Sequence, residues 1–238
     1  NEITLPKSQR LIVGIDYVNE QGENLDTFSD TPVYDESRDN TGVYVGWHAG
    51  TGRLDSEVAL RVDDNSLFGS QFTGSAAAGW SFSDATRAYA SFGEGFRGPT
   101  LNEQYSPGFG GMYAGNPDLK PEESQSAELG LEISPDAGQQ IKANAYSTRI
   151  TNMISFTGVE FRAENIAKAR IDGLELAYDK QAGPWQMALA YTWQDPRNEE
   201  TGTTLLRRPE QKFAGSLDRV FGDSARFGLE LVHSGERL

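Results

Sequence analysis

Alternation of apolar and polar residues along almost the whole chain is the feature that most constrains its fold. In the segment 11–17 every odd-numbered residue is large and apolar, and Gly14 and Asp16 lie between them. The same period of two recurs in segments 43–48, 57–63, 75–82, 128–133, 173–179, 185–193 and 227–231. Successive side chains of a β-strand point to opposite faces, so each segment predicts a strand with one apolar face. We expect about 11 strands, and no segment has a helical period.

The connections between these strands alternate between short and long. Short turns are expected at 49–53, 83–86, 135–138, 181–184 and 222–224. Long polar connections are expected at 20–40, 94–122, 153–166 and 195–208, with a shorter one near 64–71. A meander with short turns at one end and long loops at the other is typical of outer-membrane barrels. We predict an all-β, antiparallel transmembrane β-barrel; the alternative is a soluble β-sandwich or lipocalin-like barrel.

The composition fits a barrel with a wet interior. Only 37% of the 238 residues are hydrophobic, and a membrane barrel needs an apolar band only where it faces lipid. No run approaches the ~20 apolar residues of a membrane helix. The net charge of −14 argues against a nucleic-acid partner, because phosphates would be repelled. The chain has no cysteine, which excludes a disulfide scaffold and a thiolate nucleophile or metal site.

Aromatic residues lie near the ends of the apolar faces. Interfacial girdles of this kind flank the lipid-facing band of membrane barrels, and cross-strand packing is the alternative explanation. The residues concerned are Trp47, Trp80, Phe82, Tyr178, Trp185 and Trp193.

Nothing in the sequence predicts catalysis. His48 and His233 are the only histidines, which excludes a multi-histidine zinc site and leaves little choice of base for a Ser-His-Asp site. An outer-membrane barrel lipase or protease, the alternative from another functional class, would have to use one of them near the rim. His233 continues the apolar face of its strand. We therefore predict that the chain is not an enzyme.

Several long motifs occur in a fixed order. Residues 92–105 read Phe-Gly-Glu-Gly-Phe-Arg-Gly-Pro-Thr-Leu-Asn-Glu-Gln-Tyr, and 115–124 read Gly-Asn-Pro-Asp-Leu-Lys-Pro-Glu-Glu-Ser. Further matching pieces lie at 128–130, 165–175 and 205–209. In order and spacing these motifs resemble the barrels of TonB-dependent outer-membrane receptors, where alanine is usual at the position of Gly98.

The resemblance implies an architecture and a location. It implies a plug domain inside a barrel of about 22 strands, of which residues 1–238 would be one partial β-barrel domain without the plug and the C-terminal strands. It places the protein in the outer membrane of a Gram-negative bacterium, in contact with outer-membrane lipid and lipopolysaccharide. Energy for uptake would come from TonB through the plug.

The resemblance also implies a ligand. Segments 63–69, 78–80, 168–175 and 204–208 are most similar to the receptors for cobalamin in this family. Cobalamin is therefore the favoured ligand, and an iron chelate, siderophore or haem, is the alternative. No cofactor is expected here, since the calcium-bearing loops of cobalamin receptors would lie upstream of this chain.

Four residues are the candidate ligand contacts. By the resemblance, Arg207 stands at a position that contacts cobalamin, and its five-donor fork suits amide or phosphate oxygens. Alternatively, Arg207 is a basic loop end that pairs with carboxylates or lipopolysaccharide phosphates. Tyr105, Phe109 and Tyr113, in a glycine-rich loop, offer aromatic platforms for a large flat ligand, or else pack the loop against its neighbours.

Other prominent polar residues are expected to be structural. Arg97 is predicted to be a structural or lumenal residue, and Asn116 and Pro117 are predicted to shape a turn. The acidic segment 20–39 could in principle hold a hard cation, but its carboxylates are not closely spaced, which favours a solvated loop.

Overall fold

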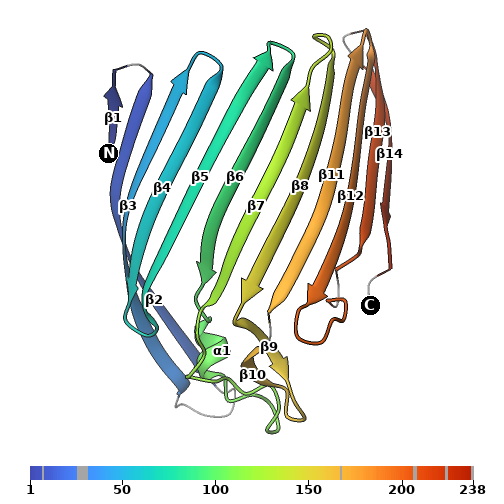
Figure 1. The fold of residues 1–238 in the computed structure, drawn as a ribbon. Helices are drawn as coiled ribbons and strands as arrows, with labels where there is room; N and C mark the ends of the chain where they lie inside the picture. The colour runs from blue at the N-terminus through green and yellow to red at the C-terminus, as the bar shows by residue number, and fades with distance from the viewer. Residues whose placement is uncertain (7, 26–31, 167, 206–207, 223–224, 237–238) are drawn as a thin grey trace.

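One curved antiparallel sheet makes up most of the protein (Figure 1). The structure is a computed structural model that describes residues 1–6, 8–25, 32–166, 168–205, 208–222 and 225–236. The sheet consists of β1 (Glu2–Leu5), β2 (Gln9–Leu25), β3 (Pro32–Thr51), β4 (Leu54–Asn65), β5 (Gly69–Ser83), β6 (Thr86–Arg97), β7 (Glu122–Ile133), β8 (Gln139–Thr151), β11 (Ala169–Ala182), β12 (Trp185–Asn198), β13 (Gln211–Phe221) and β14 (Ala225–Ser234). Each strand pairs antiparallel with the next in this order, so the predicted meander is confirmed.

Two small elements interrupt the meander. A helix, α1 (Leu101–Tyr105), lies between β6 and β7, and a separate hairpin of β9 (Met153–Thr157) and β10 (Arg162–Ile166) lies between β8 and β11. Five-residue elements are too short to show a period in the sequence. The expectation of no helix was therefore wrong for this one turn. Within the described part of the chain, no helix is long and apolar enough to cross a bilayer.

The register places the apolar residues of neighbouring strands side by side. Val13 lies opposite Val45, and Val45 lies opposite Leu60 on its other side. Farther along the sheet, Leu129 lies between Ala90 and Ala145. The pattern continues to β14, so one face of the sheet carries a broad apolar band.

This apolar face is not covered by a second layer within the described residues. Ile15 is 72% exposed and Leu129 is 66% exposed, although both lie in the middle of long strands. A β-sandwich would bury such side chains against a second sheet. A contiguous apolar surface of this size requires a non-aqueous environment or a partner, which favours the wall of a membrane barrel.

The opposite face is polar and has its own close packing. Arg61 on β4 pairs with Asp16 at 2.8 Å and with Asp63 at 2.6 Å. Tyr89 lies directly across Gly130 of the next strand, where a Cβ atom would come within 2.0 Å of the ring. The tyrosine–glycine pairs Tyr44–Gly14 and Tyr146–Gly173 repeat this arrangement. The rings therefore lie flat against the wall.

The two ends of the sheet differ as the sequence predicts. The short turns lie together at one end, at the top in Figure 1, and α1, β9 and β10 lie at the other. The expectation that residues 20–40 form a loop was largely wrong, because β2 continues to Leu25 and β3 begins at Pro32. The ends of β2 and β3 extend beyond the apolar band. Backbone pairing holds the hairpin together there, so the sequence shows no alternation of apolar residues.

Candidate ligand-binding site

Three segments meet at the loop end of the sheet. They are the long connection 98–121 that contains α1, the β9–β10 hairpin, and the extended ends of β2 and β3; we call them together the loop-end assembly. In outer-membrane barrels the longer loops are extracellular. This is therefore the end at which an external ligand would arrive.

A reciprocal cap fixes the start of α1. The Thr100 hydroxyl accepts a hydrogen bond from the Glu103 amide at 3.1 Å, and the Glu103 carboxylate accepts one from the Thr100 amide at 2.8 Å. Arg97, the last residue of β6, bridges Glu103 at 2.9 Å and Glu122 at 2.8 Å. Such a capping box satisfies two backbone donors that would otherwise lack partners. Arg97 thus has the structural role that the sequence predicts.

The charge of Glu103 reflects these contacts. Burial of its carboxyl acts to raise its pKa, but hydrogen bonds from Arg97 and Thr100 outweigh burial and lower the pKa below its ordinary value. Glu103 therefore stays ionised, and the bridge from β6 through α1 to β7 is held by charge.

Arg38 of β3 joins the β2–β3 hairpin to the long connection 98–121. Its guanidinium donates to the Pro99 carbonyl and, at 2.8 Å, to Glu20. It also lies 5.9 Å from the centre of the Phe68 ring. A Cβ atom at Gly98 would come within 2.7 Å of that ring. The Phe68 ring thus explains why residue 98 is a glycine.

The other half of the connection is joined to the β9–β10 hairpin through Asn165. The Asn165 side chain accepts from the Lys120 amide at 2.8 Å and donates to the Lys120 carbonyl at 2.9 Å and the Asn152 carbonyl at 2.7 Å. The backbones also meet, because the Ala163 amide donates to the Ala114 carbonyl at 3.0 Å. Asn165 begins one of the sequence motifs, but local periodicity gives no indication of contacts 45 residues apart.

The three aromatic candidates differ in exposure and in the rings they contact. Tyr105 is half-buried, with its ring 6.3 Å from that of Tyr34. Tyr113 stacks on Phe161 of the hairpin region at 5.3 Å between ring centres. Phe109 is 87% exposed. Loop packing therefore involves Tyr105 and Tyr113, whereas Phe109 remains open to a ligand. Arg207, the fourth candidate, lies outside the described residues.

Metal binding and catalysis find no support in the part of the chain that the structure describes. No group of three His, Cys, Asp or Glu residues there could hold a metal ion. The Nδ1 atom of His48 is buried and has no hydrogen-bond partner among these residues, so no carboxylate orients its ring through that atom. His233 lies opposite Phe213, on the apolar face.

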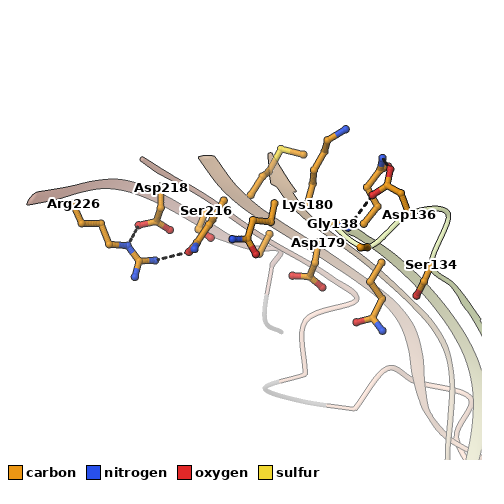
Figure 2. A pocket seen from close by; sticks show the side chains of 15 residues that line it. Ser134, Asp136, Gly138, Asp179, Lys180, Ser216, Asp218 and Arg226 are labelled. Carbon is orange, nitrogen blue, oxygen red and sulfur yellow. Dashed lines mark hydrogen bonds and ion pairs between the residues drawn. The ribbon is translucent and has the colours of Figure 1, made fainter. Parts of the chain in front are cut away.

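A further hollow lies at the other end of the sheet. It has a volume of about 720 Å³ and is lined by the turn around Asp136 and by β11 to β14 (Figure 2). Arg226 there donates to Asp218 at 3.0 Å and to Gln186 at 3.4 Å. This hollow lies beside the short turns, away from the loop-end assembly.

Comparison with known proteins gives one consistent result. The family model described as "TonB dependent receptor-like, beta-barrel" matches residues 2–237. The vitamin B12 transporter BtuB of Vibrio vulnificus (strain YJ016) is 34% identical over 227 residues, which cover 90% of this chain and 35% of BtuB.

Solved structures with the same fold include two receptors. The siderophore receptor PirA from Acinetobacter baumannii has a TM-score of 0.82 at 17% identity, over 97% of this chain and 40% of PirA. A mutant of the ferric enterobactin receptor PfeA from Pseudomonas aeruginosa has a TM-score of 0.84 at 18% identity, over 98% of this chain and 40% of PfeA. The chain thus spans well under half the length of these proteins.

Proposed function

Because the chain belongs to the family of TonB-dependent receptor-like β-barrels, we propose that it forms part of the wall of an outer-membrane receptor that takes up cobalamin. The family membership confirms the predicted family and the antiparallel barrel architecture. Residues 1–238 are proposed to be a partial barrel domain, completed by the plug and further strands in the whole receptor. TonB is the proposed energy source, acting through the plug.

The observation that carries the choice of ligand is the 34% identity to a vitamin B12 transporter across 90% of the chain. The siderophore receptors share the fold at under 20% identity, which supports the architecture and says nothing about the ligand.

Binding is proposed to occur at the loop-end assembly without chemical conversion of the ligand. Phe109 is proposed to offer an exposed aromatic surface, and Arg207 to donate to ligand oxygens. Tyr113, which remains 51% exposed beside Phe161, and Tyr105 are proposed to complete the contact. The bridges made by Arg38, Arg97 and Asn165 would hold the connection that carries Tyr105, Phe109 and Tyr113 in place, and the polar face of the wall would line the passage.

Equilibrium binding to the full-length receptor tests this proposal. Labelled cobalamin and a labelled ferric siderophore are titrated separately into the purified protein. We expect sub-micromolar affinity for cobalamin; such affinity for the chelate with none for cobalamin would refute the proposed ligand.

Two variants then test the site. Phe109→Ala and Arg207→Ala should each weaken cobalamin binding by about 1 kcal/mol or more. Phe72→Ala is the matched control, since Phe72 is a 60% exposed phenylalanine on the apolar face of β5. Equal binding by all three variants would remove Phe109 and Arg207 from the site.

A further inference from the structure

A cation lies among aromatic rings on the apolar face, at the short-turn end of the sheet. Arg219 of β13 is flanked in register by Trp185 of β12 and Phe227 of β14. Phe221, two residues farther along β13, lies on the same face. Trp185 is the first residue of its strand and Phe221 is the last of its own. We call these four residues the Arg219 cluster.

Among the residues that the structure describes, Arg219 contacts aromatic rings and makes no hydrogen bond or ion pair. Its guanidinium carbon lies 5.0 Å from the centre of the Trp185 ring and 4.6 Å from that of Phe221. Cation–π contacts of this kind hold the guanidinium by electrostatic attraction to the ring faces. The five N–H donors lie in the plane of the group and point along its edges. The rings therefore hold the charge in place and accept no conventional hydrogen bond from its donors.

The surroundings determine which acceptor these donors meet. Arg219 is on the face that carries Leu217, Leu229 and the other apolar residues of the wall, so its environment is the membrane. A charge there is costly unless it reaches the interface and finds a partner. The position beside the short turns places it at the periplasmic interface.

A neighbouring arginine shows the contrasting arrangement. Arg226 of β14 points to the inner face, where it pairs with Asp218 at 3.0 Å (Figure 2). A second cation joins Arg219 on the outer face, because Lys180 and Asp179 of β11 point to opposite sides of the sheet in Figure 2. The inner arginine is thus neutralised by the protein, whereas the outer cations face lipid.

We propose that the Arg219 cluster binds the phosphate group of a glycerophospholipid in the periplasmic leaflet. Arginine and phosphate form two parallel hydrogen bonds with matched geometry. Trp185, Phe221 and Phe227, which are 41 to 68% exposed, contact the glycerol and upper acyl region of the same lipid. The site would anchor this part of the wall at a fixed depth in the membrane.

Native mass spectrometry of the full-length receptor tests the proposal. The detergent-solubilised protein is titrated with dioleoyl-phosphatidylglycerol, and separately with dioleoylglycerol, which has the same chains without the phosphate. Arg219→Gln should bind phosphatidylglycerol about fivefold more weakly, the effect of about one interfacial cation. Arg226→Gln, which removes the same side chain from the inner face at the same end, should bind as the native protein does.

The outcomes separate clearly. Native affinity in Arg219→Gln, or an equal loss in Arg226→Gln, would overturn the proposal. Folding of each variant is checked by its mobility on a gel without boiling. If Arg219→Gln does not fold, the test compares the binding of the two lipids to the native protein. Preference for phosphatidylglycerol supports the phosphate site, and equal binding of dioleoylglycerol overturns it.

Discussion

Removal of the Asn165 side chain should release the β9–β10 hairpin from the long connection and leave the barrel wall intact. Asn165→Ala deletes three hydrogen bonds of 2.7 to 2.9 Å to the backbones of Lys120 and Asn152. At about 0.5 to 1.5 kcal/mol for each bond, the local loss of stability is about 1.5 to 4.5 kcal/mol. Opening of the segment should then be about 10- to 2,000-fold more frequent.

Amide hydrogen exchange measures this opening directly. The informative amides are those of Ala163 and Tyr113, which donate across the two segments to Ala114 and Glu160. Their protection should fall by the factor given above, whereas amides in the middle of β4 and β11 should be unchanged. Local opening of this kind is independent of global unfolding.

A second asparagine provides the control. Asn116 in the same connection makes one side-chain hydrogen bond, from the Asp118 amide at 3.1 Å. Asn116→Ala should therefore reduce protection at Ala163 much less than Asn165→Ala does. Unchanged protection at Ala163 in Asn165→Ala, or equal loss in the two variants, would show that Asn165 does not hold the segments together.

Three further predictions concern the same end of the molecule. Gly98→Ala should lower stability by about 1 to 3 kcal/mol, as overpacking does, because its Cβ would meet the Phe68 ring at 2.7 Å; thermal unfolding followed by gel mobility measures the loss, and an unchanged midpoint would contradict it. Because contacts from Arg97 and Thr100 lower the pKa of Glu103, its stabilisation of α1 should be fully present above about pH 4.3 and lost as the pH falls through the lowered pKa. Proteolysis of the loop against pH should show this, and Glu103→Gln should abolish that pH dependence. Phe109→Ala should leave thermal stability within about 0.5 kcal/mol, since its ring is 87% exposed; a larger loss would indicate a packing role.

Local sequence patterns predicted the wall of this protein well and its loop end poorly. The alternation in segments such as 11–17 correctly predicted both faces, because the period of a strand is a property of neighbouring residues. The bridge from Arg38 to Pro99 joins residues 61 positions apart, and the contacts from Asn165 to Lys120 join residues 45 positions apart. No local pattern encodes which distant backbone group a polar side chain will meet.

The aromatic candidates illustrate the same limit. Sequence composition identified Tyr105, Phe109 and Tyr113 as surface-loop aromatics and left open whether they bind ligand or pack the loop. The structure separates them, since Tyr113 stacks on Phe161 and Phe109 does not pack in this way. The difference depends on the hairpin 48 residues away, whose position follows from strand pairing and not from the loop itself.

The tyrosine–glycine pairs on the polar face have a consequence for the width of the passage. An aromatic side chain that stands upright on a barrel wall narrows the bore, whereas one lying over a glycine occupies the space that a neighbouring side chain would have filled. Tyr44, Tyr89 and Tyr146 all lie in this way. Any larger residue at Gly14, Gly130 or Gly173 would tilt a ring into the channel. In the proposed receptor, these glycines would therefore determine how much of the passage the three rings leave open.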